Sequence, residues 1–179
     1  MELSEILYSA ISDYGEHRIL SDIVQGESPE VIKVIFEHCV SNIGKFETVK
    51  PDTSGSIAEG LLHYMLTVSM IPSQRKTSFQ SVDIDIAVPD TRTLGVTPQD
   101  VVVILFPKTD NVDNIKSHIE KIKKVQPNAN NIWVVLENSP QLDAKVYSLK
   151  DSMTFSNIIN DLISFSSNRK QSKLKIFKI

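Results

Sequence analysis

The spacing of hydrophobic residues first changes at Pro72, and this change limits what the chain can fold into. Before Pro72, apolar residues recur at helical spacing over 2–13, after Ser28-Pro29-Glu30, and over about 56–69. From Val82 to Val88, apolar residues alternate with small or polar ones, which is the period of a strand. A chain that starts with helices and continues with strands is typical of an α/β domain with a helical N-terminal extension.

The second half of the chain predicts further strands and helices. The expected elements are a strand buried on both faces at 101–106, a helix at 112–125, strands at 132–136 and 145–149, a helix begun by Thr154, and an edge strand at 173–179. Two strands joined by a helical crossover of about 15 residues form a parallel pair. We therefore expect a mixed central sheet flanked by helices.

Length and composition bound the number of domains and the location of the protein. With 179 residues, 41% of them hydrophobic, the chain has enough apolar material for one core. The N-terminus is acidic where a secretory signal is basic, and no window approaches the ~18 apolar residues of a membrane span. The sequence predicts a soluble, cytoplasmic protein with no membrane partner. We expect one domain over 1–179, divided into a helical extension at 1–50, a core at 54–137 and a C-terminal strand–helix–strand unit at 138–179.

Charge and motif content exclude several kinds of site. A formal charge of −3 argues against coating nucleic acid by bulk charge, although a local basic groove stays open. The single cysteine, Cys39, cannot form an internal disulfide or a cysteine zinc cluster. The sequence has no glycine-rich phosphate motif and no serine elbow, and its histidines lack zinc-site spacing.

Two aspartates in the alternating strand are the strongest candidates for chemistry. Asp83 and Asp85 are two residues apart, so both are expected on one face, opposite Val82, Ile84 and Ile86. Paired carboxylates are hard oxygen ligands that suit Mg²⁺ or Mn²⁺. The alternative is an exposed sheet face, but aspartate is a poor strand former among valine and isoleucine.

Glu59 and Lys108 gain interest from their order relative to this strand. Glu59 follows Ser56 by three residues, which also fits a capping box at the start of a helix. Lys108 follows the buried strand at 101–106, where a lysine is often only solvated. Alone, neither residue would indicate a site.

The sequence of helix glutamate, strand aspartate and next-strand lysine resembles the PD-(D/E)xK nuclease superfamily. Its restriction-endonuclease-like core runs helix, strand, strand, strand, helix, strand. The matching segments would be the helix at 56–69, strands at 74–79 and 82–88 joined by a tight Gln80-Ser81 turn, the strand at 101–106 leading to Lys108, the helix at 112–125 and the strand at 132–136. The similarity covers roughly 54–137.

The resemblance implies a metal-dependent nuclease that hydrolyses phosphodiester bonds in DNA. Asp85 falls at the metal-binding aspartate and Asp83 at the acidic position before it. Asp85 with Asp83 or Glu59 would hold one or two Mg²⁺ or Mn²⁺ ions, and all three carboxylates are expected to face one cavity, close enough to share an ion. Asp85, Glu59 and Lys108 would be catalytic, with Lys108 orienting the water or stabilising the transition state.

Basic residues flank the carboxylate strand on both sides. Arg75 and Lys76 precede it and Arg92 follows it, so these three are expected to contact the nucleic-acid backbone. The implied partner is a nucleic acid, with DNA favoured, and a homodimer is left open.

The sequence departs from the family pattern at the acidic-x-Lys triplet. The residue two positions before Lys108 is Phe106, and alignment by the strand core puts Ile104 at the acid. Asp83, Glu59 and Asp90 are the acids that could substitute. Two alternatives follow: a catalytically degenerate nuclease-fold domain that serves as a binding or assembly subunit, and a small α/β ligand-binding or regulatory domain with solvent-exposed aspartates.

Overall fold

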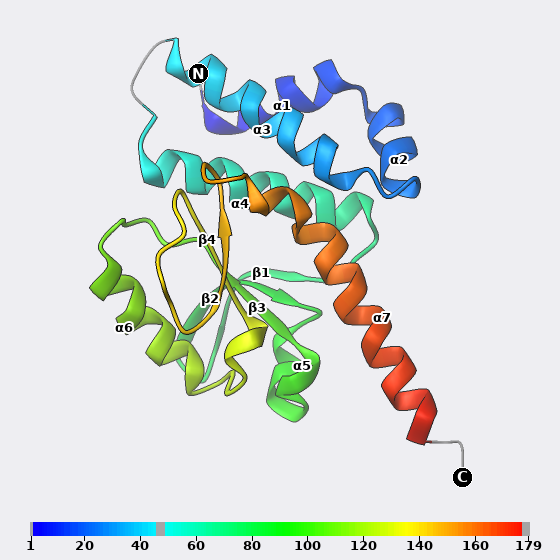
Figure 1. Cartoon of the computed structure of the whole chain (residues 1–179), viewed down its shortest axis with the longest axis vertical. Helices are drawn as coiled ribbons and strands as arrows, with labels where there is room; N and C mark the ends of the chain where they lie inside the picture. Colours follow the sequence, from blue (N-terminus) through cyan, green and yellow to red (C-terminus); the bar gives the residue numbers. More distant parts are fainter. Residues whose placement is uncertain (1, 46–48, 177–179) are drawn as a thin grey trace.

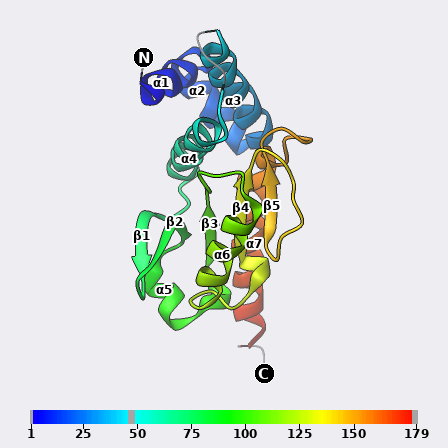
Figure 2. The same cartoon turned by 90° about the vertical axis from the view of Figure 1, so that its left-hand side faces the viewer.

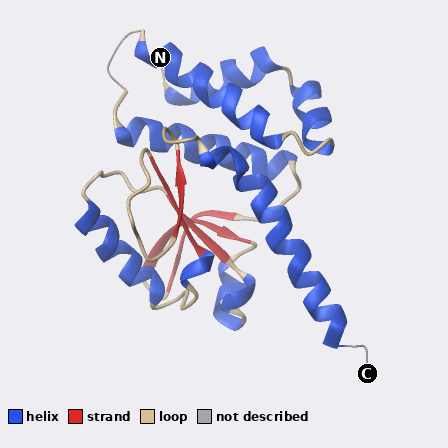
Figure 3. Ribbon diagram, viewed as in Figure 1, coloured by secondary structure: helices blue, strands red, loops and turns tan. Residues whose placement is uncertain are grey.

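The protein has an α/β fold built on a mixed sheet. The structure, a computed structural model, describes residues 2–45 and 49–176. Within these ranges the elements are α1 (Leu3–Tyr14), α2 (Glu16–Val24), α3 (Ser28–Gly44), α4 (Pro51–Val68), β1 (Gln74–Phe79), β2 (Val82–Val88), α5 (Thr91–Val96), β3 (Val102–Leu105), α6 (Val112–Lys123), β4 (Ile132–Leu136), β5 (Lys145–Ser148) and α7 (Ile158–Ile176). Figure 3 shows the strands at the centre with helices around them.

The sheet has five strands in the described ranges, in the order β1-β2-β3-β4-β5. The first three strands pair antiparallel, whereas β3, β4 and β5 run parallel. Helix α6 is the crossover from β3 to β4, as its position between two parallel strands requires. The mixed sheet expected from the sequence is confirmed.

Helices cover the sheet on two sides, and each side has its own hydrophobic core. One core joins α1, α2, α3, α4 and α7 to the sheet, and the other joins α5 and α6 to its opposite face. Figures 1 and 2 show α1, α2 and α3 stacked beyond α4 at one end of the sheet, with α6 and α7 on different sides of it. The helical N-terminal part therefore packs on the sheet domain through α4.

Strand β3 is buried on both faces, as its uninterrupted apolar sequence predicts. Val102 and Ile104 belong to the core with α4, and Val103 and Leu105 belong to the core with α6. All four residues are at most 1% exposed. Adjacent side chains of a strand point to opposite faces, so alternate residues of this strand stabilise different cores.

Strand β2 corrects the expectation of a single apolar face. Ile84 packs in the core with α6, whereas Ile86 and Val88 pack in the core with α4. Val82 is only partly buried. The side chains change sides around Asp85, where the regular pairing with β1 is interrupted, and both faces of this strand are covered by helices.

Helix α4 starts earlier than the sequence pattern indicates. It begins at Pro51, with Lys50 as its N-cap, and not near residue 56. Proline is favoured in the first turn, where its missing N–H has no partner to lose, and Asp52 places an acid at the positive end of the helix. The polar segment 16–24 and the segment 91–96 also form helices, although their sequences predicted none.

The expected edge strand at 173–179 is wrong where the structure describes it. Helix α7 continues to Ile176, and 177–179 lie outside the described residues. The sequence contains no glycine or proline after residue 158 that would end the helix. Thr154 opens a short 3₁₀ turn before α7, and its Oγ1 accepts a hydrogen bond from the Ser148 N–H at 2.8 Å.

The hairpin between β1 and β2 has the tight turn that the sequence suggested. Gln80 and Ser81 both have positive φ, 48° and 62°, which is the geometry of a type I′ turn. No helix in the described ranges is long and apolar enough to cross a lipid bilayer.

Candidate functional site

Four separate segments of the chain meet around one cavity, here called the site cavity, of about 400 Å³. The segments are α4, β1, β2 and the loop that follows β3. Its lining residues are Glu59, Lys76, Thr77, Ser78, Asp83, Ile84, Asp85 and Lys108. All four residues expected to act in catalysis or metal binding, Glu59, Asp83, Asp85 and Lys108, are therefore on its wall.

Asp85 lies where β2 and β3 separate. The ladder between these strands ends at the pair Ile86–Ile104. Beyond this pair a side chain replaces the backbone acceptor: Asp85 Oδ2 accepts a hydrogen bond from the Phe106 N–H at 2.7 Å. This bond fixes the carboxylate at the mouth of the two strands, and leaves Oδ1 to face other groups.

The charge of Asp85 is sensitive to its surroundings. Burial raises the pKa of this carboxyl above its ordinary value, the Phe106 N–H lowers it, and the negative charge of Glu59 raises it. Smaller lowering effects come from His118 on α6 and from Lys108. A buried carboxylate with a raised pKa is a frequent property of functional sites, and it gains from any cation placed beside it.

Lys76 reaches the site cavity through an unusual backbone conformation. Its φ is 48°, in the left-handed region that costs a non-glycine residue about 1 kcal/mol. Within the described hairpin, Arg75 pairs with Ile86 and Thr77 with Ile84, but the intervening pair of Lys76 with Asp85 is missing. The interruption places a cationic and an anionic side chain on the same cavity wall.

Glu59 is not a capping residue, which corrects the capping-box interpretation. Because α4 begins at Pro51, Ser56 is inside the helix, and its Oγ donates to the Asp52 carbonyl at 2.8 Å. Glu59 is 4% exposed, and its Oε1 accepts a hydrogen bond from Arg75 Nε at 2.9 Å. Only the acid of this pair is buried, since the Arg75 side chain is 33% exposed, so loss of Arg75 would leave the Glu59 charge buried without compensation.

The two residues that could stand at the acidic position before Lys108, Ile104 and Phe106, are apolar and lie in the hydrophobic core. Phe106 is 3% exposed and Ile104 is fully buried, and both belong to the core with α4. Lys108, two residues further, has left the core and lines the site cavity. Lys108 therefore lines the site cavity without an acid two residues before it.

The three carboxylates do not converge on one ion. Among the described residues, no three His, Cys, Asp or Glu side chains lie close enough together to hold a metal. The expectation that Glu59, Asp83 and Asp85 share one ion is therefore wrong for this arrangement. A site with two carboxylates is compatible with the geometry, since Mg²⁺ often takes one or two carboxylates and completes its shell with water and phosphate.

Asp90 and Arg92 belong to α5 and not to the site cavity. Asp90 caps this helix by accepting a hydrogen bond from the Thr93 N–H at 2.6 Å, and this bond lowers the pKa of its carboxyl. It is therefore not a substitute for the missing acid. Arg92 is exposed on the same helix. Of the three basic residues expected to bind nucleic acid, only Lys76 lines the cavity, and Arg75 is paired with Glu59.

Sequence reasoning missed three contributors to this site. Thr77 and Ser78 follow Lys76 on β1 and supply hydroxyl groups to the wall, and His118 acts on Asp85 from α6. The hydroxyls could have been found by aligning the two strands of the predicted hairpin. His118 carries no local signal, because its nearness depends on how α6 packs against the sheet.

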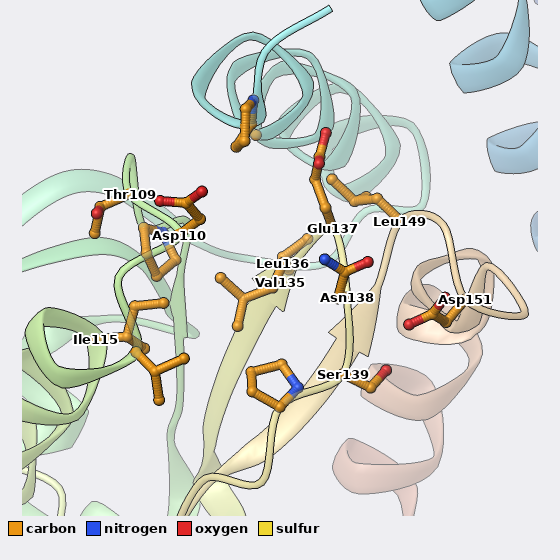
Figure 4. Close-up of a pocket in the computed structure, with 15 residues that line it drawn as sticks. Thr109, Asp110, Ile115, Val135, Leu136, Glu137, Asn138, Ser139, Leu149 and Asp151 are labelled. Atoms are coloured by element: carbon orange, nitrogen blue, oxygen red, sulfur yellow. The ribbon is translucent and has the colours of Figure 1, made fainter.

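A second hollow of about 390 Å³, here called the strand-end hollow, opens beyond the carboxyl ends of β3 and β4 (Figure 4). Glu137 follows β4 and points toward the first turns of α4. Its Oε1 accepts from Ser54 Oγ at 2.9 Å and its Oε2 from Lys150 Nζ at 2.7 Å. Both oxygens therefore tie protein segments together, which indicates a structural role for this acid.

Comparison of the chain with protein-family models, with curated proteins and with solved structures found no match.

Proposed function

We propose that the protein is a metal-dependent nuclease that hydrolyses phosphodiester bonds in DNA, with a restriction-endonuclease-like core formed by α4, β1, β2, β3, α6 and β4. The observation that carries the proposal is the site cavity, which gathers Glu59, Asp83, Asp85 and Lys108 from segments that are separated in sequence. The order of the elements supports the same fold.

Asp83 and Asp85 are the residues that would hold Mg²⁺ or Mn²⁺. Both line the site cavity, and carboxylate oxygens are the ligands these ions prefer. When bound, such an ion lowers the pKa of its water and neutralises charge on the phosphate. The Phe106 N–H orients Asp85 through Oδ2, so this carboxylate is held in place before any ligand arrives.

Lys108 and Lys76 are the protein's own positive charges on the wall of the site cavity. Lys108 lies near enough to Asp85 for its charge to lower the pKa of that carboxyl. From there it can donate hydrogen bonds to the attacking water or to a phosphate oxygen, where negative charge develops. Lys76 can contact the phosphate next to the scissile one, and Arg75 on β1 and Arg92 on α5 could contact phosphates outside the site cavity.

A second candidate function is a nuclease-fold domain without catalysis that binds nucleic acid or assembles with a partner. Two observations favour it: Phe106 is buried at the position of the acid, and the described residues include no group of three metal ligands. The two candidates differ in cation binding and in cleavage, so the same experiments separate them.

Thermal unfolding with and without a divalent cation tests the metal site. Mg²⁺ or Mn²⁺ at about 100 times its dissociation constant should stabilise the folded protein by ~2.7 kcal/mol. Asp85→Ala should abolish the shift. Asp143→Ala is the matched control, because Asp143 is exposed and pairs with Lys123 on another part of the surface. No shift for the wild type, or an equal shift for Asp85→Ala, would contradict the proposal.

Cleavage assays test the chemistry. Asp85→Asn should abolish hydrolysis of DNA and keep the fold, since it removes a ligand charge at nearly constant volume. Lys108→Ala should slow hydrolysis and spare cation binding. Cation binding without cleavage of single-stranded, duplex or branched DNA would decide for the non-catalytic candidate.

A further inference from the structure

The ion pair of Glu59 with Arg75 lies on the boundary between two hollows. Glu59 lines the site cavity, whereas Arg75 lines a hollow of about 380 Å³ between α1 and α4. The Glu59 side chain is 6% exposed and that of Arg75 is 33% exposed. The pair therefore connects a buried acid of the site to a cation that reaches solvent.

Arg75 supplies the positive charge that Glu59 would otherwise seek in the site cavity. A buried carboxylate requires a cationic partner, and here the Arg75 Nε contact at 2.9 Å provides it. Glu59 is nevertheless close enough to Asp85 for its charge to act on that carboxyl.

A phosphate is a suitable competitor for Arg75. The guanidinium has five N–H donors in a planar fork that matches phosphate geometry, and the contact with Glu59 uses only Nε. Lys76, the next residue, is on the wall of the site cavity. Arg75 itself reaches solvent in the neighbouring hollow between α1 and α4, so a phosphodiester chain that passes from one hollow to the other can contact both basic residues.

We propose that Arg75 is a positioning residue that exchanges Glu59 for a nucleic-acid phosphate, so that nucleic acid and divalent cation bind cooperatively. In the free protein the Arg75 guanidinium neutralises the charge of Glu59. With phosphate on Arg75, the charge of Glu59 becomes available to the cation at Asp85. This inference rests on the proposed function, because it takes a cation at Asp85 as its premise.

Titration with Mn²⁺ in the presence and absence of a DNA oligonucleotide with phosphorothioate linkages, which resist hydrolysis, tests the exchange. For the wild type the oligonucleotide should tighten Mn²⁺ binding about 10-fold, a usual size of coupling between two sites. Arg75→Gln alone should bind Mn²⁺ about as tightly as the wild type does with the oligonucleotide, and the oligonucleotide should add little. Arg18→Gln is the control: it removes the same charge from an exposed pair on α2 and should keep the coupling.

Glu59→Gln tests the same exchange if Arg75→Gln fails to fold. Glutamine can still accept from Arg75 but has no charge to release, so Mn²⁺ should bind the free variant as in the wild type and the coupling should vanish. Asp85-dependent Mn²⁺ binding that ignores the oligonucleotide would overturn the exchange and leave the proposed function standing. Absence of Asp85-dependent binding would overturn both.

Discussion

Glu59 and Glu137 are both largely buried glutamates, yet the protein neutralises them in different ways. Glu137 uses both carboxylate oxygens, one for Ser54 and one for Lys150, and so ties the end of β4 to α4 and to the segment after β5. Glu59 instead forms an ion pair with Arg75 on the edge strand β1. One acid is a structural link with two attachments, and the other depends on a partner that can be exchanged.

The hollows around the two acids also differ in how many charged side chains line them. The site cavity around Glu59 contains two further carboxylates and two lysines, so charge is concentrated there. The strand-end hollow around Glu137 is lined largely by apolar and small polar side chains, with Asp110 and Asp151 at its border. Concentrated charge that is only partly neutralised suits a ligand, whereas fully partnered charge suits stability.

The largest expected effect comes from removing the cation beside Glu59. Arg75→Met should lower the free energy of unfolding by about 3 kcal/mol, the lower end for a buried pair, because Glu59 loses its cation while Arg75 itself is 33% exposed. Urea denaturation at neutral pH measures the loss. The comparison variant is Lys150→Met, since Lys150 is 59% exposed and Glu137 keeps Ser54. Equal losses in the two variants would contradict the distinction between the two acids.

A second, smaller effect concerns the hydrogen bond of Asp85. Asp85→Ala should destabilise the protein by about 1–3 kcal/mol, because the Phe106 N–H loses its acceptor at a largely buried position. Asp85→Asn keeps an acceptor oxygen and should cost much less at neutral pH. Denaturant unfolding of the two variants under one condition measures the difference. A loss in Asp85→Asn as large as in Asp85→Ala would show that the charge, and not the hydrogen bond, stabilises this corner.

The pH dependence of the free energy of unfolding separates the contribution of the Asp85 charge from that of its hydrogen bond. The pKa of Asp85 is raised above 3.8 in the folded protein, chiefly by burial, so the folded state binds this proton more tightly than the unfolded state. Asp85 therefore makes stability fall as pH rises from 3.8 through the raised pKa, and adds no slope above it. Asp85→Asn should lack this decrease. Parallel pH profiles of the wild type and Asp85→Asn, measured without divalent cations, would argue against this contribution of Asp85 to the pH dependence of stability.

The sequence predicted the elements around the site better than their contacts. The helix before the hairpin, the hairpin itself and the buried strand after it were each expected from period and turn position, and the structure has all three. These elements follow from local periodicity, which a single sequence carries. The two aspartates also line one cavity, but together with Ile84, because the alternation that predicted their shared face is broken around Asp85.

The errors arose where a local pattern competed with a distant contact. Ser56 and Glu59 have the spacing of a capping box, but Pro51 starts the helix earlier and Glu59 pairs with Arg75, 16 residues away. The alternation of β2 predicted one apolar face, yet Ile84 and Ile86 enter different cores on either side of Asp85, where Lys76 has a positive φ and its pair with Asp85 is missing. Neither the ion pair nor this backbone conformation has a signature in the sequence.

The smallest expected effects are single substitutions around Glu137, and their combination is the sharper test. Lys150→Ala should cost at most about 1 kcal/mol because the lysine is mainly exposed. Ser54→Ala should cost about 0.5–1.5 kcal/mol for its neutral hydrogen-bond donor.

The double variant should lose more than the sum of the two, because the 12% exposed Glu137 side chain then keeps neither of these partners. A double-mutant cycle from urea denaturation measures the excess. Additive losses would mean that solvent, and not the pair of partners, neutralises Glu137, and the contrast with Glu59 would then rest on exposure alone.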